Sequence, residues 1–134
     1  MADIIGTPGD DILDGTPDDD LIIGLAGNDT INAGDGNDQA NGGLDTDTIN
    51  LGAGDDFGFG GAGNDTVFGG AGNDNLFGES TSETLNGITG NDFLYGGDGN
   101  DFMRGGLGDD YMDGGTGSDR ASYYDSRFVD PSIL

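Results

Sequence analysis

The sequence predicts an all-β solenoid in which short strands stack into two parallel sheets over a thin core. Three observations support this fold class. A period of nine residues runs from Gly6 to Ser122 without insertion or deletion, an acidic residue recurs at one phase of every unit, and 30 of the 134 residues are glycine. Repeats of this kind indicate units that bury a core only by stacking on one another.

The composition taken alone is typical of a disordered chain. Hydrophobic residues make up 32%, and 27 acidic residues stand against 3 basic ones, giving a net charge of -24. Little apolar surface is then available to offset chain entropy, and only the strict period argues for a fold. The charge disfavours nucleic acid and anionic membranes as partners unless a cation bridges them, and a compact form must either bind cations or repel itself.

Segments that would fix the compartment or stabilise the chain covalently are not found in the sequence. Cysteine is absent, so the chain has no disulfide, and a metal is the obvious alternative means of stabilisation. We expect no conventional N-terminal signal peptide, because no basic segment precedes an apolar run. The apolar runs are only a few residues long, so we expect no membrane span.

Along the chain we expect three parts: a lead-in at residues 1–5, a repeat block at 6–122, and a C-terminal cap or secretion-signal-like tail at 123–134. The block holds 13 units, and position six of each is acidic. The inward position is position eight, read as Leu13, Ile22, Ile31, Ala40, Ile49, Gly58, Val67, Leu76, Leu85, Leu94, Met103, Met112 and Ala121. Ala40, Gly58 and Ala121 are its weakest members.

Each unit divides into a strand and a turn. Three residues centred on position eight suffice for a short strand whose central side chain points inward. The six preceding residues, rich in Gly, Asp and Asn, form the turn, because glycine reaches positive φ. One small aliphatic side chain per nine residues buries too little surface to offset backbone entropy, so the core alone does not hold such a solenoid together.

Two consecutive units carry the full pattern. Residues 60–68 read Gly-Gly-Ala-Gly-Asn-Asp-Thr-Val-Phe and residues 69–77 read Gly-Gly-Ala-Gly-Asn-Asp-Asn-Leu-Phe. Both resemble the nonapeptide of the RTX (repeats-in-toxin) calcium-binding family, and the resemblance covers nearly the whole chain. It implies a right-handed parallel β-roll of about 13 repeats, with Ca²⁺ held between turns on the same side, that is, between units n and n+2.

The resemblance also implies the metal ligands. The first set comprises the position-six carboxylates of Asp11, Asp20, Asp29, Asp38, Asp47, Asp56, Asp65, Asp74, Asp92, Asp101, Asp110 and Asp119. Carbonyl groups at positions one, two and four complete the shell, with the glycines of positions two and four being Gly34, Gly36, Gly52, Gly54, Gly61, Gly63, Gly70, Gly72, Gly97, Gly99, Gly106, Gly108, Gly115 and Gly117. All these ligands are oxygens, which suits Ca²⁺ and argues against zinc or copper.

Alternation of the units predicts two columns of acids. One holds Asp20, Asp38, Asp56, Asp74, Asp92 and Asp110, and the other holds Asp11, Asp29, Asp47, Asp65, Glu83, Asp101 and Asp119. Thirteen turns leave eleven gaps. The unit at 78–86 has lost two glycines and carries Glu83, so we expect its two gaps to be empty or altered, leaving at most about nine regular sites and roughly 7–11 ions. The turns with Thr7-Pro8 and Thr16-Pro17 indicate an N-terminal edge with poorer binding.

The outward strand positions differ between the two sides. The even-numbered units present Leu21, Ile23, Phe57, Phe59, Phe77, Phe93, Tyr95 and Tyr111, and the odd-numbered units present Thr30, Asn32, Thr48, Asn50, Thr66, Thr84 and Asn86. The aromatic stripe indicates either a protein or polysaccharide partner or simple stacking along the sheet. The threonines resemble an ice-binding face, although threonine is also common at this position of such repeats. Arg104 and Arg120 lie on one side, which suggests either contact with an acidic polysaccharide or, more simply, pairing with nearby aspartates.

Catalysis is not expected, because the sequence offers no His, Cys or Lys. Two hypotheses remain. The first is a calcium-dependent folding module of a secreted protein, disordered without Ca²⁺, exported unfolded by a type I route and folding outside the cell. The alternative is an extracellular adhesion or ligand-binding roll that takes polysaccharide or ice. An end that is poorly capped also predicts end-to-end self-association.

Overall fold

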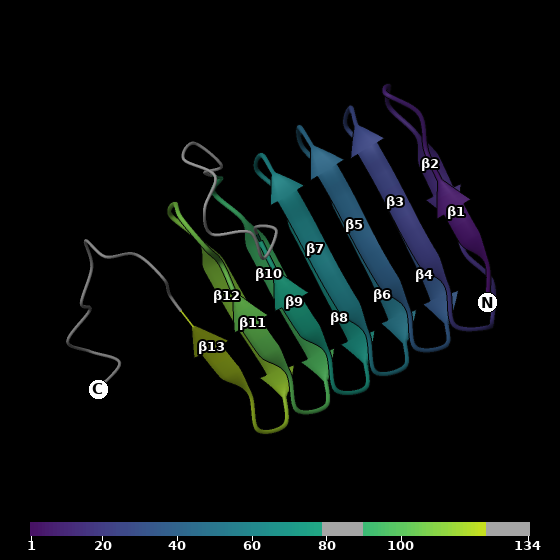
Figure 1. Ribbon diagram of the computed structural model, residues 1–134. Coiled ribbons are helices and arrows are strands. Elements are labelled where there is room, and N and C mark those ends of the chain that lie inside the picture. The colour runs from purple at the N-terminus through teal and green to yellow at the C-terminus, as the bar shows by residue number, and fades with distance from the viewer. Residues whose placement is uncertain (79–89, 123–134) are drawn as a thin grey trace.

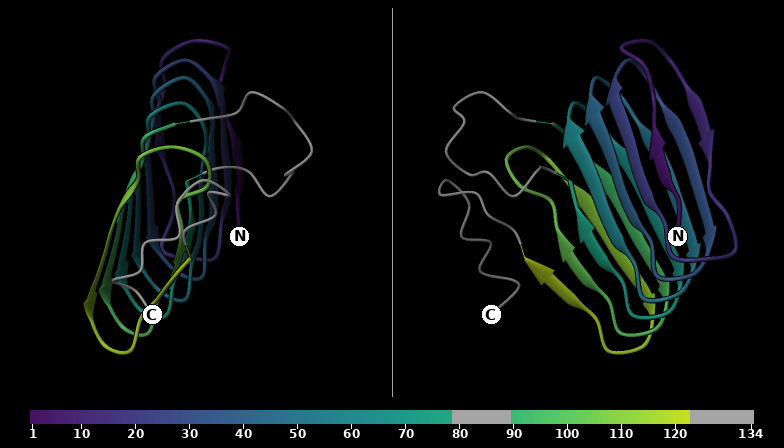
Figure 2. Two further views of the ribbon diagram at one scale, coloured as in Figure 1. Left: turned by 90° about the vertical axis from the view of Figure 1, so that its left-hand side faces the viewer. Right: turned by 45° about the vertical axis from the view of Figure 1, so that its right-hand side comes forward.

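The described residues, 1–78 and 90–122 of the computed structural model, form a stack of about six flattened coils (Figure 1). Each coil gives one strand to each of two parallel sheets, with the order β1-β3-β5-β7-β9-β11-β13 in one and β12-β10-β8-β6-β4-β2 in the other. Two further views show the coils following one another, with the turns along two opposite edges (Figure 2). The expected all-β, two-sheet parallel solenoid is confirmed.

Both sheets are built from strands of three or six residues. The seven-stranded sheet contains β1 (Asp3–Ile5), β3 (Leu21–Ala26), β5 (Gln39–Leu44), β7 (Phe57–Ala62), β9 (Asn75–Phe77), β11 (Phe102–Arg104) and β13 (Arg120–Ser122). The six-stranded sheet contains β2 (Ile12–Asp14), β4 (Thr30–Asp35), β6 (Thr48–Ala53), β8 (Thr66–Ala71), β10 (Phe93–Asp98) and β12 (Tyr111–Thr116).

The six-residue strands are longer than the sequence predicted. They run past position nine into positions one to three of the next unit, where Gly34 pairs with Gly52 and Gly52 with Gly70. Glycine allows this extension, because at position two it adopts positive φ, for example 111° at Gly52, while the backbone still reaches the neighbouring coil.

The core lies between the two sheets and is one side chain thick. Position eight points inward as predicted, with Ile22, Ile31 and Ile49 among the fully buried residues. Gly58 leaves a gap that Leu51 fills from position one of the same unit. A Cβ on Gly58 would lie 2.9 Å from Leu51 Cδ1 and 2.8 Å from Val67 Cγ1. The weak position at Gly58 is therefore compensated, whereas Ala121 in β13 is exposed.

The lead-in takes part in the stack. Its residues Asp3–Ile5 form β1, which pairs with β3 so that Ile4 lies beside Ile22. The first coil is thus completed by residues that precede the nine-residue frame.

One unit of the frame does not add a coil. Thr66 of β8 pairs with Phe93 of β10, and Asn75 of β9 pairs with Phe102 of β11, so these partners are 27 residues apart instead of 18. Gly78 and Gly90 serve as positions one and four of a single turn. Gly78 N donates to Arg104 O at 2.8 Å, and Gly90 N donates to Leu107 O at 3.1 Å.

The residues between Gly78 and Gly90 explain why this unit is passed over. Glu79 and Thr81 occupy positions two and four, where the later turns have positive φ, a conformation that costs a non-glycine residue energy. Leu25 (φ 89°) and Asp45 (φ 77°) each adopt it in a turn whose other position is glycine, whereas the unit at 78–86 would have to bear this cost twice. The chain therefore completes the turn with Gly90, Asn91 and Asp92 of the following unit. Glu83, Thr84, Leu85 and Asn86 lie outside the described residues.

Because the unit at 78–86 adds no coil, the strands after residue 78 lie in the opposite sheet to the one predicted. Phe93, Tyr95 and Tyr111 lie in the six-stranded sheet, in register with Thr66, Phe68 and one another, and not beside Phe57, Phe59 and Phe77 as predicted. Arg104 and Arg120 share the seven-stranded sheet, as expected.

Candidate metal centre

The candidate sites lie in two columns of stacked turns at opposite edges of the sheets. The first turn column precedes the strands of the six-stranded sheet and carries Asp11, Asp29, Asp47, Asp65, Asp92 and Asp110 at position six. The second turn column precedes the strands of the seven-stranded sheet and carries Asp20, Asp38, Asp56, Asp74, Asp101 and Asp119. The predicted columns were wrong for the last four aspartates, because the unit at 78–86 adds no coil.

Within each column the aspartates form a continuous hydrogen-bond ladder. The backbone N–H of Asp47 donates to Asp65 Oδ1 at 2.9 Å, and that of Asp65 donates to Asp92 Oδ1 at 2.8 Å. In the second column Asp38 N–H donates to Asp56 Oδ1 at 2.7 Å. The ladder is intact across residues 79–89 in both columns, because Asp74 N–H likewise donates to Asp101 Oδ1 at 2.9 Å. The two gaps that were expected to be altered beside Glu83 are therefore replaced by gaps with the same contact as their neighbours.

The second carboxylate oxygen behaves differently. Oδ2 is buried and accepts no hydrogen bond in Asp29, Asp38, Asp47, Asp56, Asp65, Asp74 and Asp101. Buried polar atoms in folded proteins nearly always have a partner, and a buried anionic oxygen without one is costly. Seven such atoms at equivalent positions indicate a ligand that the protein itself does not supply.

The electrostatics of these aspartates lead to the same conclusion. Burial raises the pKa of Asp47 and Asp74 to about 7 and that of Asp56 and Asp65 to about 6. Neighbouring aspartates add to the rise at Asp47, Asp56 and Asp74. A bound cation stabilises the charged form and removes this penalty.

Glycine at position one shapes the space in front of Oδ2. A Cβ built on Gly60 would lie 2.6 Å from Asp65 Oδ2 and 2.6 Å from the carbonyl oxygen of Gly78 in the next turn. A carboxylate oxygen and a carbonyl oxygen therefore face one position between two turns. Ala33 and Leu51 replace glycine in two turns, and both belong to the hydrophobic core.

All the glycines predicted at positions two and four have the required backbone. Each has positive φ, from 84° at Gly115 to 144° at Gly54. A Cβ on Gly54 or Gly72 would collide with the position-four carbonyl oxygen of the preceding turn, so these carbonyl groups point along the column into the gap between turns. Such close approach of backbone is possible because the side chain is absent.

The sequence interpretation missed a second ladder at position five. Asp19 Oδ1 accepts from Asn37 N at 2.8 Å, Asn37 Oδ1 from Asp55 N at 2.9 Å, and Asp55 Oδ1 from Asn73 N at 2.9 Å. These side chains reach toward the C-terminal turn, whereas the position-six side chains reach toward the N-terminal one. The recurrent Asp or Asn at position five was the signal that could have revealed this ladder. The ladder accounts for the recurrence of Asp and Asn at position five without a metal.

The donor set fits calcium. No three acidic side chains converge anywhere in residues 1–78 and 90–122, so backbone carbonyl oxygens would have to complete the shell around the one or two carboxylates at each site. Ca²⁺ accepts six to eight such oxygen ligands in flexible geometry, whereas metals that favour nitrogen or sulfur have no ligands here, since the sequence contains no His or Cys.

Comparison with known families decides the assignment. The model of the RTX calcium-binding nonapeptide repeat matches four segments, at residues 5–40, 23–58, 51–82 and 86–121. The chain belongs to the RTX calcium-binding nonapeptide repeat family. Membership implies that the stacked turns of this RTX roll bind Ca²⁺, and it identifies no catalytic domain. Comparison with curated proteins found no match.

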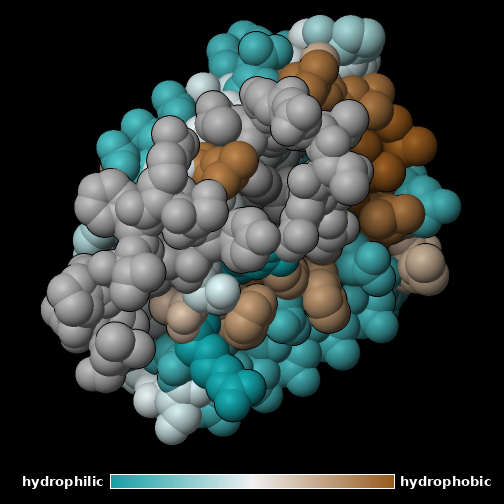
Figure 3. Space-filling view, turned by 60° about the vertical axis from the view of Figure 1, so that its left-hand side comes forward, coloured by the Kyte–Doolittle hydropathy of each residue, from teal (hydrophilic) through white to brown (hydrophobic). Residues whose placement is uncertain are grey.

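The outer faces of the RTX roll carry aromatic clusters. Phe59 stacks on Phe77 with ring centroids 5.0 Å apart on the seven-stranded sheet, and Phe68 stacks on Tyr95 at the same distance on the six-stranded sheet. Hydrophobic residues are gathered in patches on an otherwise hydrophilic surface (Figure 3). A shallow groove of about 280 Å³ lies over β3, β5 and β7, lined by Ile23, Leu25, Asn41, Gly43, Leu44, Gly61 and Ala62. The described part of the chain contains no apolar helix long enough to cross a membrane.

Proposed function

We propose that this RTX roll is a calcium-dependent folding module of a secreted protein. The observation that carries the proposal is the set of seven buried Oδ2 atoms that have no hydrogen-bond partner. Without a cation, the folded state must either leave these anions unpaired or protonate them, and the core is only one side chain thick. With Ca²⁺, each cost is removed at the turn where it arises, so metal binding and folding are coupled.

The charge of the chain gives this coupling a direction. At a net charge of -24 the metal-free chain repels itself and stays extended. An extended chain is suited to passage through a narrow export channel of the type I kind, and calcium outside the cell then folds it. Folding after export opposes return of the chain.

A calcium titration followed by far-UV circular dichroism tests the folding proposal. We expect a cooperative change from coil to β structure as Ca²⁺ rises, reversal by EDTA, and no such change with Mg²⁺, which prefers a smaller, octahedral site. A β spectrum that persists in EDTA at neutral pH would contradict it.

A non-catalytic role is part of this proposal. The position-six aspartates are engaged in the turn ladders, and the groove over β3, β5 and β7 is lined mainly by apolar residues and glycine. Neither feature supplies an activated nucleophile or an acid–base pair.

A second candidate function, binding of an acidic polysaccharide, is favoured by one face. On the seven-stranded sheet Phe59, Phe77 and Phe102 form a continuous row, with ring centroids 5.0 and 5.9 Å apart. Arg104 lies in register with Phe77, and Arg120 with Phe102. Flat rings stack on sugar faces, and guanidinium groups bind carboxylates.

Binding of a polyuronate to the calcium-loaded roll tests this candidate, with a neutral glucan as the control polymer. Phe77→Ala should abolish binding, and Thr48→Ala on the opposite sheet should leave it unchanged. Equal retention of both polymers, or none, removes the candidate. The Thr30, Thr48 and Thr66 ladder of the ice-binding alternative is present but ends at Phe93; thermal hysteresis is its test.

End-to-end self-association, if it occurs, would involve the end coils of the stack. Ile5 and Ile12 in the first coil are 64% and 76% exposed, and the proposed C-terminal cap at 123–134 lies outside the described residues. Sedimentation in Ca²⁺ over a range of protein concentrations would reveal end-to-end association.

A further inference from the structure

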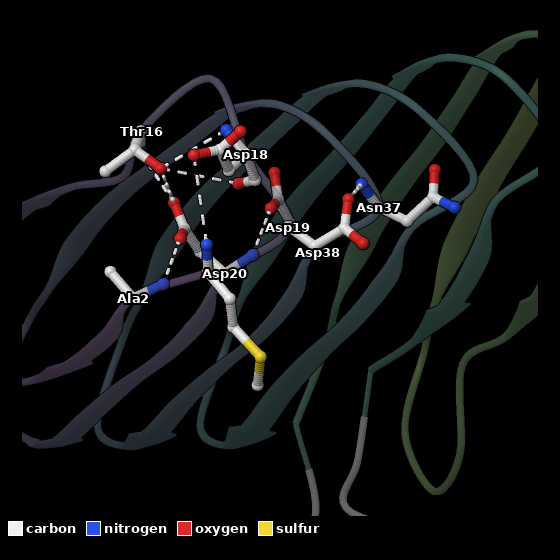
Figure 4. A network of polar contacts seen from close by, with 8 residues as sticks. Ala2, Thr16, Asp18, Asp19, Asp20, Asn37 and Asp38 are labelled. Carbon is white, nitrogen blue, oxygen red and sulfur yellow. Dashed lines mark hydrogen bonds and ion pairs between the residues drawn. The ribbon is translucent and has the colours of Figure 1, made fainter.

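In the first turn of each column the aspartate Oδ2 accepts hydrogen bonds from a threonine, whereas in seven of the later turns it is buried without a partner. Thr16 N–H and Thr16 Oγ1 donate to Asp20 Oδ2 at 2.6 and 2.8 Å, while Ala2 N–H donates to Asp20 Oδ1 at 2.6 Å (Figure 4). Asp20 is only 3% exposed, yet both of its carboxylate oxygens have partners. In the next turn of the column, Asp38 Oδ2 is buried with none.

The first turn of the other column repeats this arrangement. Thr7 N–H and Thr7 Oγ1 donate to Asp11 Oδ2 at 2.5 and 2.9 Å. The surrounding oxygens are placed as in the later turns, because a Cβ on Gly6 would lie 2.6 Å from Gly24 O and 2.8 Å from Asp11 Oδ2. The threonine thus supplies donors at the oxygen that is buried without a partner in seven of the later turns.

The sequence of these turns explains the difference. Both read Gly-Thr-Pro, and Pro8 and Pro17 favour an extended backbone at the preceding threonine. Neither threonine has the positive φ that glycine adopts at position two of the later turns. The hydroxyl also accepts from the position-four N–H, at 3.3 Å from Gly9 and 3.2 Å from Asp18, which closes the turn on itself.

The electrostatic consequence is visible at Asp20. Burial acts to raise its pKa, but hydrogen bonds from Thr16 and Ala2 outweigh burial and leave the pKa below 3.8. Asp38 lacks such donors at Oδ2, and burial raises its pKa. Both carboxylate oxygens of Asp20 thus have hydrogen-bond donors within the protein.

We propose that Thr7 and Thr16 take the place of the metal ion in the first turn of each column, so that the first coil is a calcium-independent end of the roll. This inference rests on the proposed calcium-dependent folding of the remaining coils. Turns with threonine at position two would then need no ion, whereas turns with glycine at position two would need one.

The direct test converts a threonine turn into a calcium turn. Thr7→Gly/Pro8→Ala makes the first turn Gly-Gly-Ala-Gly-Asp-Asp, which matches residues 60–65 except at position five. We expect the folded variant to bind one more Ca²⁺ per chain than the parent in equilibrium dialysis. Thr7→Ser keeps the hydroxyl and should keep the parent stoichiometry. An unchanged count in the folded Gly/Ala variant would overturn the proposal.

If the first coil of the Thr7→Gly/Pro8→Ala variant does not fold, a second pair of variants still tests the proposal. Thr7→Val/Thr16→Val removes only the hydroxyls, and Thr7→Ser/Thr16→Ser retains them. Loss of hydrogen bonds to a charged carboxylate lowers the stability of the folded roll. Because several Ca²⁺ ions bind as the roll folds, each ion has to offset only part of that loss, so we expect the calcium midpoint to rise only about twofold for the Val pair. Equal midpoints for the Val and Ser pairs would contradict the role of the hydroxyls.

Failure of the inference and failure of the proposed function are separable. If the parent were folded in EDTA, calcium-dependent folding would be refuted. A lower Tm in EDTA for Thr7→Val/Thr16→Val than for the Ser pair would still support the threonine bonds, and equal Tm values would refute them.

Discussion

Asp65 and Asp92 are neighbours in the first turn column, joined by a 2.8 Å hydrogen bond from Asp65 N–H to Asp92 Oδ1 across 27 residues. The corresponding bond from Asp47 to Asp65 spans 18. One nonapeptide can therefore be passed over without breaking the column, because the next unit supplies an equivalent turn. Whether a nine-residue unit forms part of a coil therefore depends on the residues of its turn and not only on its place in the sequence.

The first prediction concerns the residues between Gly78 and Gly90. Replacing residues 79–89 with Gly-Ala makes the turn Gly-Gly-Ala-Gly-Asn-Asp, identical to residues 60–65. We expect the β content and calcium midpoint to be retained, with stability in Ca²⁺ changed by about 1 kcal/mol or less, since shortening the chain between two paired segments has a small entropic effect. Deletion of residues 60–68 is the control, because it removes a coil strand and should weaken folding. Loss of folding on the Gly-Ala replacement would contradict the observed pairing.

A second prediction separates the roles of two adjacent aspartates. Asp56→Asn removes the anionic oxygen that faces the gap, so we expect one fewer Ca²⁺ per chain and a higher calcium midpoint. Asp55→Asn keeps the acceptor that holds Asn73 N–H at 2.9 Å, and other turns already carry Asn there. Equilibrium dialysis should show the parent stoichiometry for Asp55→Asn. The same loss in both variants would mean that surface charge, and not the position-six ligand, governs binding.

The third prediction follows from the raised pKa values. In the metal-free roll Asp47 and Asp74 titrate at about 7 and Asp56 and Asp65 at about 6, against 3.8 for an ordinary aspartate. The folded state then binds more protons than the unfolded state between about pH 4 and 7, so its stability increases as pH falls through this range. We expect the chain in EDTA to gain β structure on acidification toward pH 4. Because protons compete with Ca²⁺ for these carboxylates, the calcium midpoint should rise in the same direction. A midpoint unaffected by pH would argue against these aspartates as ligands.

The fourth prediction concerns the compensated gap in the core. Leu51→Ala should lower the free energy of unfolding in Ca²⁺ by about 2–5 kcal/mol, because it leaves a cavity beside Gly58. Gly58→Ala should cost about 1–3 kcal/mol through crowding against Leu51 and Val67. The double variant should cost less than the sum, since Leu51→Ala removes one of the two crowding contacts, and urea unfolding would measure the coupling. Additive effects would show that Leu51 and Gly58 do not share this space.

The sequence predicted most of the fold because the period, the inward position and the turn glycines are all local signals. Ile22, Ile31 and Ile49 are buried as position eight required. The sides of Phe93, Tyr95 and Tyr111 were wrong for a physical reason: passing over nine residues preserves the frame and leaves no trace in the pattern. The unit is marked only by the loss of glycine at Glu79 and Thr81 and by Glu83 in place of aspartate, and these changes indicated a poor metal site as readily as an omitted coil.

Other features depend on three-dimensional neighbours and could not be read from the spacing. Leu51 fills the gap at Gly58 from position one, which in other units is usually glycine. The Thr16 bonds to Asp20 depend on a turn conformation set by Pro17, although the Gly-Thr-Pro sequence did indicate an unusual N-terminal edge.

The coupling of calcium to folding is tested most directly by the radius of gyration of the chain, measured by small-angle X-ray scattering at neutral pH. For 134 residues, an unfolded chain has a radius of about 38 Å and a compact one about 14 Å, with an elongated roll somewhat above the latter. We predict a value near the unfolded limit in EDTA and a return to the compact range in millimolar Ca²⁺. A compact radius in EDTA, or an expanded one in saturating Ca²⁺, would contradict the account.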